Sequence, residues 1–165
     1  MSQTEHQARS SEEATARHGS ISADYSVSRV EPQSIDAVWP QIAPMVRRGL
    51  KHGAGDSITE EQILHALYAG QMELWAIHNG EEIIAGLVLQ IIQRSKGPAL
   101  IVIFQAGRDF ALWSERVNGL IRDYADLIGA YTVEAVCRKG AAKWLEDLGW
   151  KRKAITMAME MNNGR

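Results

Sequence analysis

The chain has 165 residues, 45% of them hydrophobic and 23% charged, and carries a formal net charge of -2. This length and composition are typical of one soluble domain with a sizeable core, and without a basic excess we expect no nucleic-acid partner. The single Cys137 excludes an internal disulfide framework, and the apolar stretches are far shorter than the ~20 residues that span a bilayer. We therefore expect a cytoplasmic protein with no membrane span.

Residues 1–24 are rich in Ser, Glu, Ala and His and contain almost no large apolar side chains. Such a segment buries too little surface to offset its ordering entropy, so we expect a disordered tail, with a docking arm as the alternative. It also lacks the apolar stretch of a secretory signal. The ordered domain is expected to occupy residues 25–165 and to open with a short alternating strand over 26–30.

A helix is predicted to start at Pro32 and Ser34, because apolar residues then repeat at helical spacing and form one face. That face comprises Ile35, Val38, Trp39, Ile42 and Val46. Pro40 and Pro44 conflict with the pattern and are expected to kink the helix or to split it in two.

A second helix is expected after Ser57 or Thr59, either of which can cap it in a capping box. Its buried face would hold Ile63, Leu64 and Leu67. An antiparallel meander follows, because Asn79-Gly80 is a strong hairpin signal and Gly97-Pro98 marks a second turn. Its three strands are expected over 72–78, 81–93 and 99–105.

The last part of the chain predicts a right-handed crossover, in which a strand, a helix of about 20 residues and a second strand leave two strands parallel. The second strand is expected over 130–136. A short helix over 139–147 follows, with Trp144, Leu145 and Leu148 facing inward, and a strand over 154–161 closes the domain.

The turn between the first crossover strand and its helix is a candidate anion site. It contains Gly107 and Asp109, and the N–H groups at the start of a helix point toward the carboxyl end of the preceding strand. The structural alternative is that Gly107 only makes the turn and that Asp109 is an ordinary helix cap. The sequence leaves both interpretations open.

The order of these elements resembles the fold of the GCN5-related N-acetyltransferases (GNAT). The closing segment, with Ala141-Ala142, Trp144-Leu145 and Leu148-Gly149-Trp150, is similar to the A-x-x-L-Y-x-x-x-G-F ending of that family. The resemblance implies an α+β sandwich, with a mostly antiparallel sheet, one splayed parallel strand pair and helices on both faces. Divergent acetyltransferase-like proteins of phages and prophages carry a G-R-K-G segment that is similar to Cys137-Arg138-Lys139-Gly140.

The resemblance also implies that acetyl-CoA binds in the splay and that a Q/R-x-x-G-x-G/A turn holds its pyrophosphate. The corresponding residues here are Phe104, Gln105, Ala106, Gly107, Arg108, Asp109 and Phe110. Gln105 takes the first motif position, but Gly107 comes one place early. Phe110 is bulky where the backbone must approach a phosphate, and Asp109 adds negative charge that Arg108 can offset.

Acetyl transfer to an amine needs a base for the amine proton and benefits from an acid for the thiolate. Glu134 and Glu73 are the candidate bases, although a solvated strand-face charge is the alternative for each. The tyrosine that serves as the acid in the family falls on Leu145, and Cys137 is either a substitute donor or a small buried hydrophobe. No histidine has a second ligand at metal spacing, so we expect no metal site.

Two functions remain open from the sequence. The first is an acetyl-CoA-dependent N-acetyltransferase that acts on an unknown amine. The second is a catalytically inactive protein of the same fold that serves as a virion or assembly component of a phage. A protein partner or a homodimer is expected in the second case. After Trp150 there is room for only one further strand, and an unpaired edge of that strand would also favour dimerisation. A small regulatory domain of another family would lack the splayed crossover.

Overall fold

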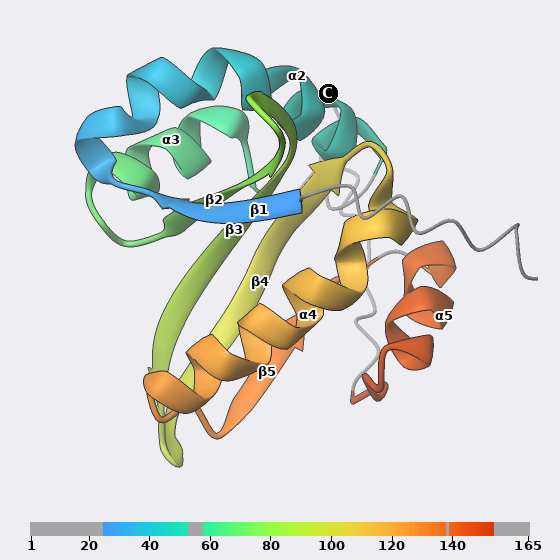
Figure 1. Cartoon of the computed structure of the whole chain (residues 1–165). Helices are drawn as coiled ribbons and strands as arrows, with labels where there is room; N and C mark the ends of the chain where they lie inside the picture. Colours follow the sequence, from blue (N-terminus) through green and yellow to red (C-terminus); the bar gives the residue numbers. More distant parts are fainter. Residues whose placement is uncertain (1–24, 53–57, 138, 154–165) are drawn as a thin grey trace, which may run out of the picture.

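A mixed five-stranded sheet organises the chain in the computed structural model, which describes residues 25–52, 58–137 and 139–153 (Figure 1). The strands are β1 (Tyr25–Val30), β2 (Glu73–Asn79), β3 (Glu82–Arg94), β4 (Gly97–Gly107) and β5 (Thr132–Ala135). The helices are η1 (Pro32–Ser34), α2 (Ile35–His52), α3 (Glu60–Tyr68), α4 (Phe110–Leu127) and α5 (Lys139–Asp147). The tail predicted at 1–24 and the closing strand predicted at 154–161 lie outside the described residues.

The strand order is β1-β2-β3-β4-β5, and each neighbouring pair is antiparallel except the last. β4 precedes α4 in the chain and β5 follows it, and the two strands pair in parallel. The predicted meander of β2, β3 and β4 and the predicted crossover from β4 to β5 are both confirmed. The turn between β3 and β4 falls at Ser95-Lys96, just before the expected Gly97-Pro98. A mixed sheet with one parallel pair and helices on both faces is the predicted fold class.

Helices cover the two faces of the sheet and create two hydrophobic cores. α2 and α3 pack on one face, where Ile42 and Ile63 are fully buried. α4 packs on the other face, where Trp113 and Val117 are buried against β3 and β4 (Figure 1). Because both faces of β3 are covered, its residues 83–89 form a continuous buried run instead of an alternating one.

α2 is one continuous helix, so of the two predicted effects of its prolines, a kink or a split, the split does not occur. Pro40 and Pro44 both lie on the exposed side, where water can satisfy the carbonyls that lose an N–H partner. The opposite side holds the predicted apolar face, and Ile35, Ile42 and Val46 are buried there. Burial of this face along the whole helix outweighs the two missing hydrogen bonds.

α3 begins at the capping box that its sequence predicts. The Thr59 hydroxyl accepts a hydrogen bond from the Gln62 N–H at 3.2 Å, and the Gln62 side chain accepts one from the Thr59 N–H at 2.8 Å. The helix ends at Tyr68, Ala69 caps it, and Gly70 follows with a φ of 67°. Ile63 and Leu67 are buried as expected, and Leu64 is half-buried.

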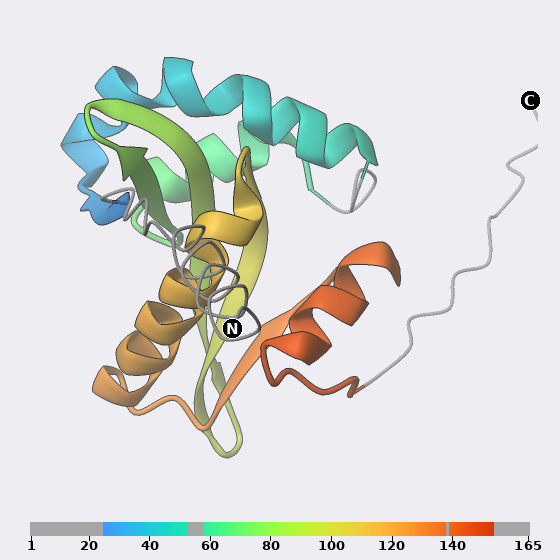
Figure 2. The same cartoon turned by 45° about the vertical axis from the view of Figure 1, so that its right-hand side comes forward.

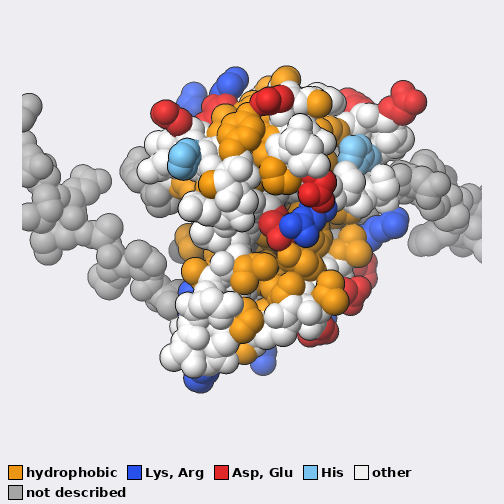
Figure 3. All heavy atoms as spheres, turned by 90° about the vertical axis from the view of Figure 1, so that its left-hand side faces the viewer, with side chains coloured by type: hydrophobic (Ala, Val, Ile, Leu, Met, Phe, Trp, Pro, Cys, Tyr) orange, Lys and Arg blue, Asp and Glu red, His pale blue; other side chains and the backbone are white. Residues whose placement is uncertain are grey.

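The face opposite α5 mixes apolar and charged surface. Figure 3 shows hydrophobic side chains gathered over this face, with acidic and basic side chains next to one another near its middle. No helix in the described part of the chain is long and apolar enough to cross a membrane.

Candidate functional site

A cleft opens where β4 and β5 separate. The two strands pair only from Ala99–Val102 on β4 to Thr132–Ala135 on β5, while β4 continues to Gly107. Figure 2 shows the strands side by side at one end and diverging toward the other, with α5 beyond the gap. Within residues 25–52, 58–137 and 139–153, no strand pairs with the β5-facing backbone groups of β4 beyond Val102.

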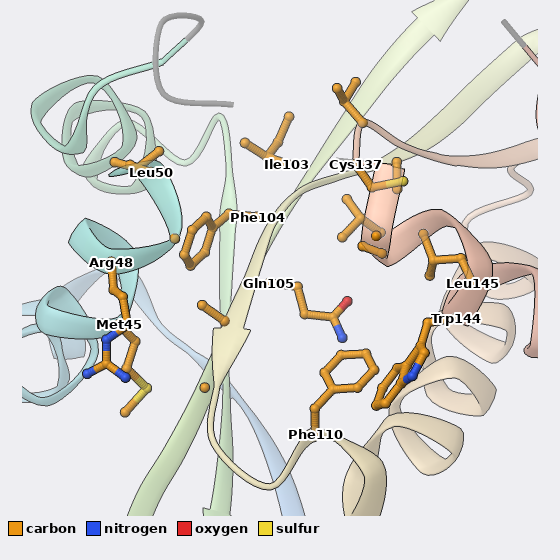
Figure 4. Close-up of a pocket in the computed structure, with 18 of the residues that line it drawn as sticks. Met45, Arg48, Leu50, Ile103, Phe104, Gln105, Phe110, Cys137, Trp144 and Leu145 are labelled. Atoms are coloured by element: carbon orange, nitrogen blue, oxygen red, sulfur yellow. The ribbon is translucent and has the colours of Figure 1, made fainter. Parts of the chain in front are cut away.

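The cleft has a volume of about 940 Å³ and is lined mostly by apolar side chains (Figure 4). Its size suits a small-molecule ligand. The lining comes from α2 and the segment after it (Met45, Arg48, Gly49, Leu50, Ile58), β4 (Val102, Ile103, Phe104, Gln105, Ala106, Gly107), the start of α4 (Phe110), the end of β5 and beyond (Ala135, Val136, Cys137), and α5 with the segment that follows it (Gly140, Ala141, Trp144, Leu145, Trp150).

A bulge in β4 lies at the cleft. Val88 of β3 pairs with Phe104 and Leu89 pairs with Val102, so Ile103 has no counterpart. A bulge leaves its extra residue unpaired, and bulges are common beside active sites, where they redirect backbone and side chains. Backbone donors and acceptors of β4 are therefore available at the point where the cleft begins.

Gly107 is required by strand packing. A Cβ at this position would lie 2.5 Å from the Ile84 carbonyl oxygen and 2.6 Å from the Ala85 Cα, both of which belong to β3. The next N–H, from Arg108, is also committed, because it donates to the Ile84 carbonyl at 3.0 Å. Close approach of β4 to β3 thus explains the glycine that comes one place early in the family's motif.

The start of α4 keeps the features of an anion site only in part. Asp109 is at the helix cap with a φ of 55°, and its side chain makes no capping hydrogen bond, so it is not the ordinary cap considered from sequence. The N–H groups of Phe110 and Ala111 precede the first intrahelical bond and have no helical partner. The Phe110 ring lies 4.1 Å from that of Trp144 and 4.7 Å from that of Trp113, measured between centroids.

The predicted cofactor residues divide into two groups. Phe104, Gln105, Ala106, Gly107 and Phe110 line the cleft, and Gln105 points toward Phe110 and Trp144 (Figure 4). Arg108 and Asp109 do not line it. The Arg108 guanidinium pairs with the Glu82 carboxylate on β3 and lies 4.0 Å from the Asp109 carboxylate. These contacts hold the charge of Arg108 at the protein surface.

Glu134 lies on β5, next to the cleft-lining Ala135, but is not itself part of the lining. Its carboxylate accepts hydrogen bonds from Arg94 at 2.7 Å and from Lys153 at 3.2 Å. Burial would raise the pKa of Glu134, but these two hydrogen bonds outweigh it and lower the pKa below its usual value. The carboxylate is therefore ionised at neutral pH.

Glu73 lies at the start of β2, away from the cleft. It accepts a hydrogen bond from the Tyr124 hydroxyl at 2.7 Å and forms an ion pair with Arg29 at 3.2 Å. Burial, followed by the hydrogen bond to Glu73, raises the pKa of Tyr124 to about 12. This cluster connects β1, β2 and α4.

α5 contributes the wall of the cleft opposite β4. Leu145, at the position of the family's tyrosine, lines the cleft, and so does the exposed Cys137. Trp144 is 40% exposed and lies against Phe110, so its predicted inward packing was wrong. An inward position was inferred from helical spacing alone, and the cleft separates this helix from the sheet.

Sequence reasoning missed the wall that α2 supplies. Met45, Arg48 and Leu50 reach the cleft because the end of α2 packs closely on β4. A Cβ on Gly49 would overlap the Phe104 ring, with its Cζ only 2.6 Å away, which shows how close that approach is. A glycine and a basic residue near a helix end carry no specific signal for this contact. No group of three or more metal-ligating side chains occurs among the described residues.

No family model and no curated protein matches the sequence. The structure is similar to that of an aminoglycoside acetyltransferase from an uncultured soil metagenomic sample, solved with sisomicin, with a TM-score of 0.62, 10% identity and coverage of 84% of this chain and 97% of that one. A ribosomal-protein-alanine N-acetyltransferase from Brucella melitensis gives a TM-score of 0.61 and 9% identity, with coverage of 83% and 99%.

Glucosamine-6-phosphate N-acetyltransferase from Arabidopsis thaliana gives a TM-score of 0.56 and 15% identity, with coverage of 84% of this chain and 99% of that one. At such low identities these likenesses show the fold. It is the fold of the GNAT acetyltransferases, as the order of elements predicts.

Proposed function

We propose that this GNAT-fold chain is an N-acetyltransferase that binds acetyl-CoA in the cleft between β4 and β5 and transfers the acetyl group to an amine. The observation that carries the proposal is the separation of β4 from β5 after Val102, which leaves a cleft of about 940 Å³ ending at the N-terminus of α4. In the described part of the chain, the unpaired edge of β4 and the first N–H groups of α4 lie along one path, which suits a long ligand with an anionic end.

In the reaction, the neutral amine nitrogen attacks the thioester carbonyl carbon, a C–N bond forms and the C–S bond breaks. The amine loses its proton to a base, and the departing thiolate accepts one. The chain's own contribution begins with orientation. Unpaired backbone groups near Ile103 are placed to hold amide and carbonyl groups of the ligand, and the N–H groups of Phe110 and Ala111 face its phosphates.

Proton transfer in this proposal depends on water. Glu134 is the nearer of the two candidate bases, because Ala135 beside it lines the cleft, and Glu73 is the more distant one. Neither carboxylate lines the cleft, so each would act through a water relay. Leu145 cannot donate a proton to the thiolate, which leaves Cys137 and water as the donors at this wall.

Cys137 allows a direct test, because it is the only cysteine of the chain and lies exposed in the cleft. We expect acetyl-CoA to slow its alkylation by N-ethylmaleimide at least tenfold at saturation. The matched control is the double variant C137A/L112C, because Leu112 on α4 is 64% exposed and does not line the cleft. Acetyl-CoA should leave its alkylation rate unchanged. Equal rates with and without acetyl-CoA in the native chain would overturn the proposal.

A non-catalytic protein of the same fold, acting as a phage virion or assembly component, is the second candidate. The observation that favours it is the leucine at the position of the family's acid, together with the Phe110–Trp144 contact in the cleft. Thiol release measured with acetyl-CoA and a panel of amines separates the two. Acetyl-CoA protection of Cys137 without any turnover supports the second candidate, whereas product formation that is lost in Glu134→Gln supports the first.

A further inference from the structure

The cleft extends to both sides of β4, and its two sides differ in chemistry. Phe110 and Trp144 lie on the side of α4 and α5, whereas Arg48 and Phe104 lie on the side of α2 (Figure 4). The free helix N–H groups that suit a phosphate are on the Phe110 side. The α2 side, defined by Met45, Arg48, Leu50, Ile58, Ile103 and Phe104, is therefore left for a second ligand.

Arg48 is the only charged side chain in the part of the cleft lining that the structure describes. The preceding residue, Arg47, is neutralised by Glu60, to which it donates two hydrogen bonds at 2.6 and 2.9 Å. Among the described residues no carboxylate lies within 4.0 Å of the Arg48 guanidinium. The α2 side thus combines an apolar surface with one available positive charge.

We propose, on the basis of the acetyltransferase function proposed above, that the acceptor amine belongs to a molecule with an apolar body and an anionic group, and that Arg48 binds the anion. A guanidinium binds carboxylates and phosphates through charge-assisted hydrogen bonds. A polycationic acceptor would place several positive charges near the positive charge of Arg48. No carboxylate in the described lining of the cleft would compensate this repulsion. This chain therefore selects against polyamine antibiotics of the kind bound by the metagenomic enzyme.

The test compares three amines bound to the protein in the presence of acetyl-CoA, by NMR titration and by thiol release. The amines are L-phenylalanine, which carries a carboxylate, L-phenylalaninamide, which lacks it, and tobramycin, which is polycationic. We expect phenylalanine to bind about tenfold more tightly than the amide, as a charge-assisted hydrogen bond implies, and tobramycin to bind most weakly. Arg48→Met should abolish the preference for the carboxylate.

Arg152→Met is the matched control, because Arg152 pairs with Glu146 outside the cleft lining, and it should keep the preference. Tighter binding of tobramycin, absence of binding by all three amines, or an unchanged preference in Arg48→Met would overturn the inference. A tenfold loss of acetyl-CoA affinity in Arg48→Met, without an effect on the amines, would assign Arg48 to the phosphates of acetyl-CoA and would also overturn it. Protection of Cys137 by acetyl-CoA, measured in parallel, shows whether the proposed function itself holds.

Discussion

Substitution of Gly107 by alanine tests whether this glycine serves strand packing. The added Cβ would lie 2.5 Å from the Ile84 carbonyl oxygen and 2.6 Å from the Ala85 Cα. Both atoms belong to the backbone of β3, so a side-chain rotation cannot relieve the overlap and the strands must move apart. Overpacking of a close-packed site costs about 1–3 kcal/mol, and an overlap with backbone belongs at the upper end. We expect Gly107→Ala to lower the free energy of unfolding by about 3 kcal/mol.

Gly119→Ala is the matched control, because Gly119 lies inside α4 and an added Cβ there meets nothing within 4 Å. We expect this variant to be about 1 kcal/mol more stable than the native chain, since alanine is the better helix former. Urea unfolding followed by circular dichroism measures both changes. If Gly107→Ala unfolds at the native urea concentration while acetyl-CoA binding is lost, the glycine serves ligand approach, and our explanation of it is wrong.

Further predictions concern the capping box, the charge of Glu134 and the aromatic contact in the cleft. Thr59→Ala removes the hydroxyl that caps α3 and should cost about 1 kcal/mol in urea unfolding, whereas Thr59→Ser should cost much less. The pKa of Glu134 is lower in the folded chain than in the unfolded chain, where it is about 4.3. The ion pairs of Glu134 therefore stabilise the fold fully above about pH 4.3, and this stabilisation is lost as the pH falls through the folded pKa. Glu134→Gln should therefore cost under about 1 kcal/mol at pH 7 and nothing at pH 3, and an equal cost at both would contradict the ion-pair explanation. Phe110→Ala removes the contact between the Phe110 and Trp144 rings, worth about 1 kcal/mol, which acetyl-CoA must displace when it binds. Calorimetry should therefore show about fivefold tighter binding of acetyl-CoA, and weaker binding would show that the ring contacts the ligand.

Most of the fold could be predicted from the sequence because its signals are local. The Asn79-Gly80 turn, the Thr59 cap and the helical spacing of the apolar residues in α4 each involve residues close in the chain. The prolines of α2 show the limit of local rules. Pro40 and Pro44 oppose a helix by themselves, and the burial of the opposite helix face on the sheet overrides them.

The candidate site was predicted less completely, because its walls come from distant segments. The β4 side follows from the strand and turn pattern, and the sequence placed Gln105 and Phe110 there. The α2 side depends on how closely Gly49 approaches Phe104, which no sequence spacing reveals. The pairing of Arg108 with Glu82 is likewise a contact between distant segments, and it removes from the cleft a charge that the family resemblance places near a phosphate.

Titration of the isotope-labelled protein with acetyl-CoA, followed by backbone amide NMR signals, tests the central proposal most directly. The cleft between β4 and β5 predicts saturable shifts that centre on residues 102–111 of β4 and the start of α4, and on residues 135–145 from the end of β5 into α5. Signals of β1 and α3 should stay in place, because neither element borders the cleft. Absence of any shift at millimolar acetyl-CoA, or shifts centred on β1 and α3, would contradict the proposed binding site.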